Sequence, residues 1–593
     1  MNCALVWLPF NEHTMPPLGI ANLVGFLRKN GKKAEAVDLN IALFDRFRSL
    51  YRSHSSFADD ESLPWSENTL FQQAAAERAF PERVRPIAYP QWKHLHVPWV
   101  IEDFLRFSSE RLAGRYGLVG ISVTNVSFFM AVALSRMLKR SSEDLLLVWG
   151  GPSIRPDQSL GPFRDLDFVD LFVYGAGERP LNEILERLSG QGGVKPEGLQ
   201  GIPGTIWKNG CDLRVEARPR SEGPEASQPD FSDFPLASYE ELRLPVRTAA
   251  GCAWSKCAFC AEPGMLESYL PRPLEDVAGE LQLSVKKQGR VPYFFVDNCL
   301  NVDPERLHRL CGELRSIGDL SWTCMVRSRG LDEELMRAMH AAGCRGLFIG
   351  LESFSDEVLC AMNKGCTRLD HLKAFRLARE TGIPMMGNFL IAFPTEKASD
   401  IRETILILKR YTHLWIGCRF WLSPFSVTPG SRVHENPGEY GVRVLEWSDE
   451  TRDLPGALSD CVPAWNLNWL PVQETSPAAI EKCGLYRELE RILDIVHTRE
   501  LPDQFVVEGT NGLSVHSENE SRTKTTEVCL SDGEAGILRF CRDIREMEAL
   551  RREARMEMGS LEKELSEMEN RGWVAVSGTQ VLTTVPWLAA RVG

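Results

Sequence analysis

The stretch GCAWSKCAFC, residues 251–260, places Cys252, Cys257 and Cys260 within nine residues. Three thiolates on one loop can bind three corners of a metal cluster, whereas a structural zinc or a fully ligated [4Fe–4S] cluster needs a fourth ligand. The next cysteine, Cys299, lies 39 residues further on. The pattern therefore favours a cluster with one open iron. The alternatives are zinc with one further ligand and three cysteines buried in a core, for which a loop beginning at Gly251 is unfavourable.

The loop resembles the cluster loop of the radical S-adenosylmethionine (SAM) superfamily. In that family the open iron of a [4Fe–4S] cluster binds the amino and carboxylate groups of SAM. The usual gaps between the cysteines are three and two residues, whereas here they are four, AWSK, and two, AF. The longer first gap is similar to that of some branches of the family. The resemblance implies that Cys252, Cys257 and Cys260 hold the cluster and that SAM binds beside them.

Bulk composition excludes several classes of protein. A chain of 593 residues is too long for one core, so three or four domains are expected. The net charge of −13 argues against nucleic acid or an anionic membrane as the main partner. The sequence contains no run of 18 apolar residues, so no membrane span is expected. The start MNCALVWLPF lacks the basic region of a signal peptide. Sixteen cysteines are then interpreted as reduced thiols, which predicts a cytoplasmic protein.

Residues 1–190 alternate short apolar runs with amphipathic stretches, which predicts a doubly wound, Rossmann-like α/β domain. Residues 40–115 interrupt this alternation as a helical insertion. Strands are expected at 3–8, 34–39, 118–123, 145–148 and 168–173, and helices at 18–30, 127–140 and 179–189. The Gly-rich turns follow strand ends, where such sheets bind ligands.

The order PPLG, GIS, GGP, GAGE in this domain resembles the cobalamin-binding domain of B12-dependent radical SAM enzymes. A DxHxxG motif, which supplies a histidine to cobalt, is absent, so the resemblance implies cobalamin without a protein histidine ligand. Glycines let the backbone approach a bulky ligand, although they could equally make only tight turns. The residues that the resemblance places at cobalamin are Ser122, Thr124, Gly150, Gly151, Pro152, Gly177 and Glu178.

Residues 191–245 are rich in Gly, Pro and Ser and predict a linker with a hairpin. From 246 to 435, about six strand–helix units predict a partial (β/α)6 TIM barrel, whose chemistry should lie at the carboxyl ends of its strands. Polar residues gather at those predicted ends independently of the cysteine motif. They are Asp297, Asn298, Arg327, Glu352, Ser353 and Asn388.

The GLES strand, residues 350–353, matches the family strand that contacts SAM, and a carboxylate such as Glu352 suits an ammonium group. Arg327 matches an arginine near the SAM carboxylate or cobalamin, and Asp297 occupies the position of a differently lettered family motif. For each residue the alternative is a polar side chain that merely completes a strand end. The resemblance implies SAM contacts from Phe259, Asp297, Arg327, Glu352, Ser353 and Asn388. The segments MNKG (362–365) and FLIAFP are expected to be structural.

Residues 436–525 form a mixed segment with Trp- and Pro-rich stretches such as VPAWNLNWLPV, which serve either substrate recognition or a core. HSENESRTKTT (516–526) is expected to be a loop. Residues 526–593 predict helices followed by a β-wing, which is a winged-helix-like unit, and its capping pattern runs from Ser531 to Glu534. Its acidic character argues against DNA binding. It resembles a module that holds leader peptides in enzymes that mature ribosomally made peptides (RiPPs).

Together these resemblances imply a cobalamin-dependent radical SAM C-methyltransferase acting on a peptide or a small natural-product intermediate. The cofactors expected are a [4Fe–4S] cluster, SAM and methylcobalamin, with flavodoxin or ferredoxin as electron donor. One alternative is a B12 radical SAM enzyme that rearranges its substrate or forms a ring. A second is an iron–sulfur electron-transfer or sensor protein, which the barrel pattern and Glu352 disfavour. No catalytic residue beyond the cofactor ligands is assigned.

Overall fold

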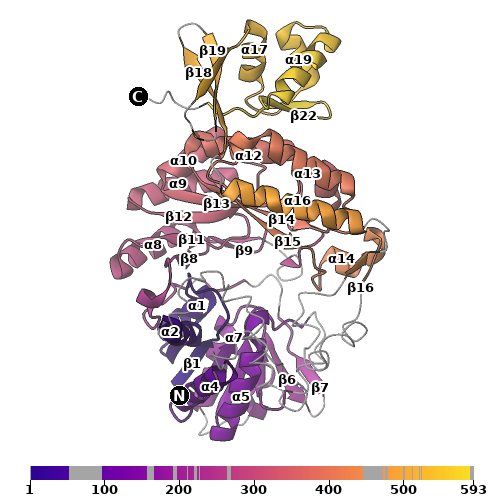
Figure 1. Ribbon diagram of the computed structural model, residues 1–593. Coiled ribbons are helices and arrows are strands. Elements are labelled where there is room, and N and C mark those ends of the chain that lie inside the picture. Colours follow the sequence, from indigo (N-terminus) through magenta and orange to yellow (C-terminus); the bar gives the residue numbers. More distant parts are fainter. Residues whose placement is uncertain are drawn as a thin grey trace.

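Three units follow one another along the computed structural model of the protein (Figure 1). The N-terminal unit lies at one end, an open half-barrel lies in the middle, and the C-terminal unit lies at the opposite end. The described residues are 2–52, 97–156, 166–190, 196–209, 212–218, 223–225, 227–262, 269–444, 472–474, 479–498, 501–509, 512–519, 521 and 524–587. Within these ranges, no helix has both the length and the apolar character needed to cross a bilayer.

The N-terminal unit is built on a seven-stranded sheet with the order β2-β1-β3-β4-β5-β6-β7. The first five strands pair in parallel, and the hairpin β6–β7 adds two antiparallel strands at one edge. The strands are β1 (Asn2–Trp7), β2 (Lys33–Asp38), β3 (Leu118–Ser122), β4 (Leu146–Gly150), β5 (Leu171–Val173), β6 (Thr205–Asn209) and β7 (Asp212–Val215). The hairpin expected after residue 190 therefore continues the sheet of this unit.

Helices cover both faces of this sheet, which confirms the doubly wound α/β fold. Alternate residues of β1 show the two sides, because Leu5 packs into the core beneath α1 and α7 whereas Val6 packs into the core beneath α4 and α5. The helices are α1 (Leu18–Lys29), α2 (Leu39–Arg52), α4 (Val97–Leu112), α5 (Phe128–Ser141) and α7 (Glu178–Gly190). Most of the predicted insertion 40–115 lies outside the described residues.

The half-barrel is a six-stranded sheet with the order β15-β14-β13-β12-β11-β8, in which every neighbouring pair is parallel. Among the described strands, β8 and β15 are the edges and do not pair with each other, so the barrel is partial, as predicted. The strands are β8 (Leu244–Val246), β11 (Tyr293–Phe295), β12 (Trp322–Val326), β13 (Cys344–Glu352), β14 (Met385–Ile391) and β15 (Arg419–Pro424).

Helices connect these strands and cover one face of the sheet. They are α8 (Leu274–Gln288), α9 (Pro304–Ile317), α10 (Glu333–Ala341), α11 (Asp356–Ala361), α12 (Arg368–Thr381) and α13 (Ala398–Arg410). Trp415 precedes β15 and follows a 3₁₀ turn, and its indole Nε1 donates to Leu408 O at 2.9 Å in the buried core.

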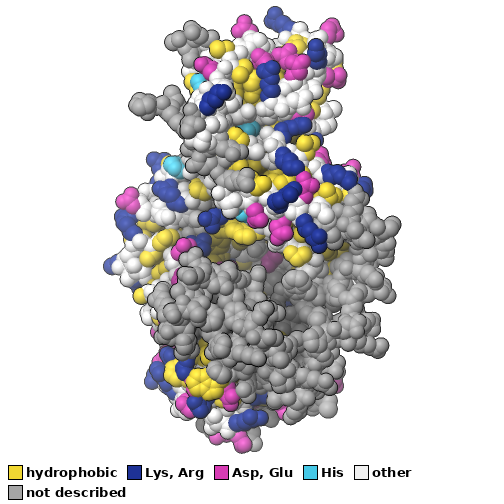
Figure 2. All heavy atoms as spheres, in the orientation of Figure 1, with side chains coloured by type: hydrophobic (Ala, Val, Ile, Leu, Met, Phe, Trp, Pro, Cys, Tyr) yellow, Lys and Arg dark blue, Asp and Glu magenta, His cyan; other side chains and the backbone are white. Residues whose placement is uncertain are grey.

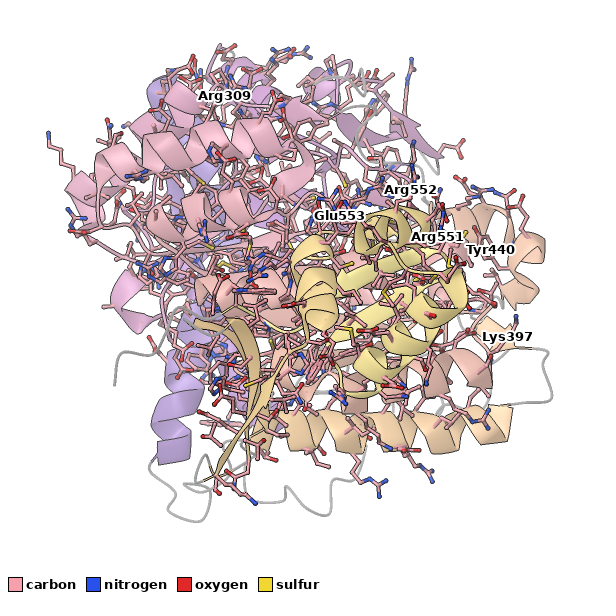
Figure 3. All side chains as sticks on the ribbon, turned by 90° about the horizontal axis from the view of Figure 1, so that it is seen from above. Arg309, Lys397, Tyr440, Arg551, Arg552 and Glu553 are labelled. Atoms are coloured by element: carbon pink, nitrogen blue, oxygen red, sulfur yellow. The ribbon has the colours of Figure 1, made fainter. Side chains whose placement is uncertain are left out.

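The segment 436–525 contributes a long helix that the sequence reading did not single out, α16 (Ala479–Thr498). It packs on α13 and β15 and runs along one side of the half-barrel, as the view from above shows (Figure 3). The smaller elements near it are α14 (Arg432–Glu435), β16 (Val442–Val444) and β17 (Val472–Glu474). The Trp- and Pro-rich stretch 462–471 lies outside the described residues.

The C-terminal unit begins with a three-stranded antiparallel sheet, β18 (Asp503–Gly509), β19 (Gly512–Glu518) and β20 (Thr525–Cys529). The loop predicted at 516–526 is therefore wrong in part, since both of its ends belong to paired strands. These polar residues form strands because backbone bonds to the neighbouring strand hold them, without an apolar face of their own.

Three helices and a small antiparallel sheet complete this unit, which agrees with the winged-helix-like prediction. The Ser531–Glu534 capping box is present at the first helix. The elements are α17 (Asp532–Phe540), β21 (Arg545–Glu546), α18 (Met547–Ala554), α19 (Met558–Asn570), β22 (Val574–Ser577) and β23 (Gln580–Thr583). On the face shown in Figure 2, Lys and Arg are interspersed with Asp and Glu over this unit.

Candidate functional site

The three-cysteine loop follows the first strand of the half-barrel. It connects β9 (Ala249–Ala250) with β10 (Leu270–Pro271), and these two short strands pair antiparallel. The loop turns at Gly251, whose φ of +77° favours glycine. Cys260 N–H donates to Cys257 O at 3.2 Å, which makes a tight turn between these two candidate ligands. All three cysteines are partly buried.

The MNKG turn at the end of α11 holds this loop from the other side. Ala258 N–H donates to Met362 O at 2.8 Å, and the indole Nε1 of Trp254 donates to Asn363 O at 2.9 Å. Gly365 has a φ of +68°, and a Cβ there would lie 2.1 Å from the Trp254 ring. The turn is therefore structural, as predicted, and the structure it supports is the cluster loop.

A buried ion pair lies beside the loop at the carboxyl end of β13. Lys364 Nζ donates to Glu352 Oε1 at 2.7 Å, and these residues are 8% and 7% exposed. The Lys364 ammonium also lies 5.5 Å from the centre of the Phe259 ring. A Cβ at Gly350 would lie 2.6 Å from Glu352 Oε1 and 2.6 Å from Lys364 Nζ, so the ion pair leaves no room for a side chain at this position of the GLES strand. Glu352 itself has a φ of +61°, a strained conformation of the kind that gathers at functional sites.

Arg327 and Asp297 follow neighbouring strands and have different surroundings. The Arg327 guanidinium stacks 4.2 Å over the Trp254 ring and donates to Lys364 O, while its Nε has no hydrogen-bond partner among the described residues. Asp297 accepts from the Thr248 N–H at 2.9 Å and from the Thr248 hydroxyl at 2.7 Å. Arg327 therefore contacts the cluster loop, whereas Asp297 ties β11 to the residues after β8.

Ser353 and Asn388 are also placed at strand ends. The Ser353 hydroxyl accepts from Ser355 N–H at 3.0 Å and is buried at the start of α11. Asn388 accepts from the Ser423 hydroxyl at 2.8 Å. Asn388 is in register with Gly350 and Trp421, so these three share the sheet face opposite the helices. On that face Trp421 is 47% exposed and stacks on Phe348 at 6.4 Å.

The N-terminal unit and the half-barrel enclose a large cavity between them. It holds about 2380 Å³, counting the solvent at its open mouth. From the half-barrel it is lined by Arg247, Gly251, Glu262 and Asn298, which joins it to the first residue of the cluster loop. Six of the seven residues predicted at cobalamin also line it: Ser122, Gly150, Gly151, Pro152, Gly177 and Glu178.

Two predicted residues of this set have other surroundings than expected. Thr124 is not part of the cavity lining, and its hydroxyl donates to Asn11 Oδ1 at 3.1 Å. Gly151 has a φ of +98°, and a Cβ there would lie 2.7 Å from Val123 N. The glycine is thus required by the close approach of β3 and β4, and not by the cavity alone.

Charge and burial act in opposite directions on the cluster-loop thiols. Burial raises the pKa of Cys257, which the cations of Lys364 and Arg327 oppose, and burial raises the pKa of Cys260 to about 11. Because metals bind thiolates, iron binding here would release protons. In the described part of the chain, no three His, Cys, Asp or Glu side chains converge on one metal-ion site. In an iron–sulfur cluster each cysteine thiolate binds a different iron, so the three thiolates need not converge on one point.

Lys364 and Arg247 are site residues that the sequence reading missed. Lys364 belongs to the MNKG segment. The one signal for it in the sequence was its position directly before Gly365. Arg247 directly precedes Thr248 in the entry to the cluster loop, where its side chain had no recognisable motif.

Comparisons with known proteins show what this chain resembles. Residues 246–408 match the radical SAM superfamily. An uncharacterized methyltransferase of Pyrococcus horikoshii is 27% identical over 300 residues, covering 49% of this chain and 64% of that protein. This chain therefore spans less than two thirds of the length of that relative.

Two solved structures share the fold. The radical SAM methyltransferase TsrM from Kitasatospora setae, with cobalamin and a [4Fe–4S] cluster bound, matches with a TM-score of 0.56 and 20% identity, over 84% of this chain and 92% of that chain. The cobalamin-dependent SAM radical enzyme OxsB, with aqua-cobalamin and SAM bound, matches with a TM-score of 0.56 and 15% identity, over 84% and 71%. At this identity the likeness is one of fold. Residues 246–408 of this chain therefore resemble the radical SAM superfamily in sequence, within a chain that folds like TsrM and OxsB.

Proposed function

We propose that this protein is a cobalamin-dependent radical SAM enzyme that methylates an unactivated carbon of a ribosomally made peptide. The observation that carries the proposal is one juxtaposition. The three-cysteine loop begins at Gly251 in the wall of a cavity whose other wall is the Gly-turn face of the N-terminal unit. In TsrM and OxsB, cobalamin accompanies a cluster or SAM in a similar fold.

The cluster would be held by Cys252, Cys257 and Cys260, and SAM by the groups around them. Glu352 suits the ammonium of SAM and Lys364 suits its carboxylate, because each would exchange its present partner for an opposite charge. Phe259, Arg327, Ser353 and Asn388 are proposed neighbours of SAM, and Asp297 supports the loop from Thr248. When bound, these groups supply an electron for SAM cleavage and, from cobalamin, a methyl group.

Cobalamin would lie in the large cavity against Ser122, Gly150, Pro152 and Gly177. The fit rests on size and on chemistry, because the cavity is lined by apolar residues together with charged ones such as Arg247 and Glu178, and Glu178 Oε2 lacks a hydrogen-bond partner among the described residues. Walls from two units would hold the cofactors in a fixed geometry and exclude water from the reacting carbon.

A peptide substrate is supported by the C-terminal unit. Its strand β20 is an edge of the β18-β19-β20 sheet, and all five of its residues are exposed. Exposed strand edges bind extended peptides by backbone hydrogen bonds. A peptide anchored there could present a distant segment to the strand ends of the half-barrel, and the anchor would raise the effective concentration of that segment.

The cofactor part is tested by anaerobic reconstitution with iron, sulfide and hydroxocobalamin, followed by SAM and a reductant. Stoichiometric cluster and cobalamin with release of 5′-deoxyadenosine are expected. A cluster that cleaves SAM without any bound cobalamin would remove the methyltransferase proposal.

The substrate part is tested with peptides encoded by short reading frames beside the gene for this protein. A mass gain of one methyl group on such a peptide is expected, and Val528→Pro in β20 should weaken peptide binding without lowering cluster content. A control change at the exposed Glu553 of α18 should leave binding unchanged (Figure 3). Methylation of a small molecule with no peptide binding would overturn the peptide assignment and keep the reaction.

A further inference from the structure

Glu178 is a buried acid without its full complement of hydrogen bonds. It is the first residue of α7, only 4% exposed, and it lines the cavity between the N-terminal unit and the half-barrel. Its Oε2 has no hydrogen-bond partner among the described residues. Burial raises the pKa of this carboxyl, and Arg247 is the charged side chain that opposes this most. A buried polar atom left in this way requires a partner.

Arg247 lines the same cavity from the half-barrel. Burial lowers the pKa of its guanidinium, and Glu178 opposes this more than any other charged side chain. Even so, the structure records no ion pair within 4.0 Å between them, and the Arg247 guanidinium forms no hydrogen bond with another described residue. By contrast, the neighbouring Arg272 is paired with Glu280 at 2.7 Å. Two opposite charges therefore face one cavity from two units without touching.

A group that satisfies both charges must donate to a carboxylate and accept from a guanidinium. A ligand carboxylate would be repelled by Glu178, and a ligand ammonium by Arg247. A primary carboxamide is neutral and carries an acceptor oxygen beside a two-proton donor nitrogen. Cobalamin carries such carboxamides around the rim of its corrin ring, and the cavity is large enough for a ligand of this class.

We propose that Glu178 and Arg247 hold one peripheral carboxamide of cobalamin between them, the nitrogen donating to Glu178 and the oxygen accepting from Arg247. This inference rests on the proposed function. The corrin then joins the N-terminal unit to the radical SAM domain, and the two residues select a neutral amide over the corresponding acid. Both act as cofactor-binding residues and take no part in proton transfer.

The test measures binding of hydroxocobalamin to the full chain by equilibrium dialysis. We expect Glu178→Gln and Arg247→Gln each to weaken binding about ten- to hundredfold, the range for losing a hydrogen bond to a charged group. Matched controls are Arg309→Gln on α9 and Glu553→Gln on α18, two exposed residues that do not line the cavity and are labelled in Figure 3. Cluster content and thermal unfolding are measured alongside, so that a misfolded variant is recognised.

A second arm changes the ligand instead. The cobalamin monocarboxylic acids each have one peripheral amide converted to a carboxylate. One of them should bind the wild type more weakly than cobalamin does, and Glu178→Gln should recover that loss, because the repelling charge is gone. If the wild type loads its cluster but binds no cobalamin, the proposed function fails. If the wild type binds cobalamin and both variants match the controls, or if no acid is rescued by Glu178→Gln, this inference fails alone.

Discussion

The half-barrel meets its two neighbours in different ways. Toward the N-terminal unit it borders a cavity of about 2380 Å³, open solvent included, which Glu178 and Arg247 line without forming an ion pair with each other. Toward the C-terminal unit it forms direct contacts, such as the two hydrogen bonds of 2.8 and 2.9 Å from Arg379 to Asp503. Direct contacts such as the hydrogen bond of 2.9 Å from Arg243 N–H to Thr14 O also join the N-terminal unit to the segment before β8. The difference is therefore the large cavity, which the first interface encloses beside its direct contacts.

The largest effect should come from the cluster loop. Changing Cys252, Cys257 or Cys260 to Ala should each abolish cluster binding, because a cluster with two remaining thiolates is poorly held. Iron content and the visible absorption of the reconstituted protein measure this. Cys360→Ala, at an exposed cysteine of α11, is the matched control and should bind iron normally. Normal iron content in Cys257→Ala would refute the ligand assignment.

The Glu352–Lys364 pair should show the next largest effect. Lys364→Met leaves a buried carboxylate unpaired, so unfolding free energy should fall by about 3–5 kcal/mol, and SAM binding should weaken at least tenfold. The double variant Glu352→Leu/Lys364→Met should regain most of the stability but not SAM binding. Calorimetric titration with SAM and thermal unfolding separate the two. A double variant that binds SAM as the wild type does would exclude both residues from the SAM site.

The interface with the C-terminal unit should respond in stability only. Asp503→Ala removes the partner of Arg379, and both side chains are largely buried, so docking should weaken by about 3–5 kcal/mol. Hydrogen exchange of β18–β23 should increase while cluster content stays unchanged. A loss of cluster in this variant would mean that the two interfaces are coupled, and the contrast drawn between them would be wrong.

Glu396 gives a pH-dependent effect of intermediate size. It accepts from Ala392 N–H at 2.9 Å and from the Tyr486 hydroxyl at 2.5 Å, and burial raises its pKa to about 7. Because the folded pKa is raised, its stabilising contribution is complete below pH 4.5 and is lost as pH rises through 7. Relative to Glu396→Gln, the wild type should lose on the order of 3 kcal/mol between pH 4 and pH 8. If the unfolding free energies of the two proteins changed equally between pH 4 and pH 8, this prediction would be wrong.

The smallest effect is expected for Lys373, which pairs with Asp543 at 2.7 Å across the same C-terminal interface. Asp543 is more than half exposed, so Lys373→Ala should cost less than about 1 kcal/mol, and the cost should shrink further in salt. Thermal unfolding at low and high ionic strength tests this. A cost equal to that of Asp503→Ala would mean that solvent exposure does not determine how much each of these ion pairs contributes to stability.

The sequence predicted those features that local pattern controls. Buried parallel strands such as Leu118–Ser122 are continuous apolar runs, and the Ser531–Glu534 cap needs only four residues. Lys364 was missed because its partner Glu352 and its neighbour Phe259 come from other segments, which the fold brings together. Strand β20 was missed because all of its residues are exposed and only pairing with β19 defines it. Arg247 is recognisable only once two units meet around it.

The helix α16 has a consequence for how the protein is made. The edge strand β15 presents its Phe420 N–H outward, and His497 Nε2 near the end of α16 accepts it at 2.8 Å. Among the described residues, α16 supplies the group that accepts from this edge, so residues 246–424 are followed by some seventy further residues before His497 is synthesised. Such an edge is a template for pairing with other chains. Nascent or truncated chains that end before Ala479 should therefore aggregate, and chaperone binding should be concentrated in this interval of synthesis.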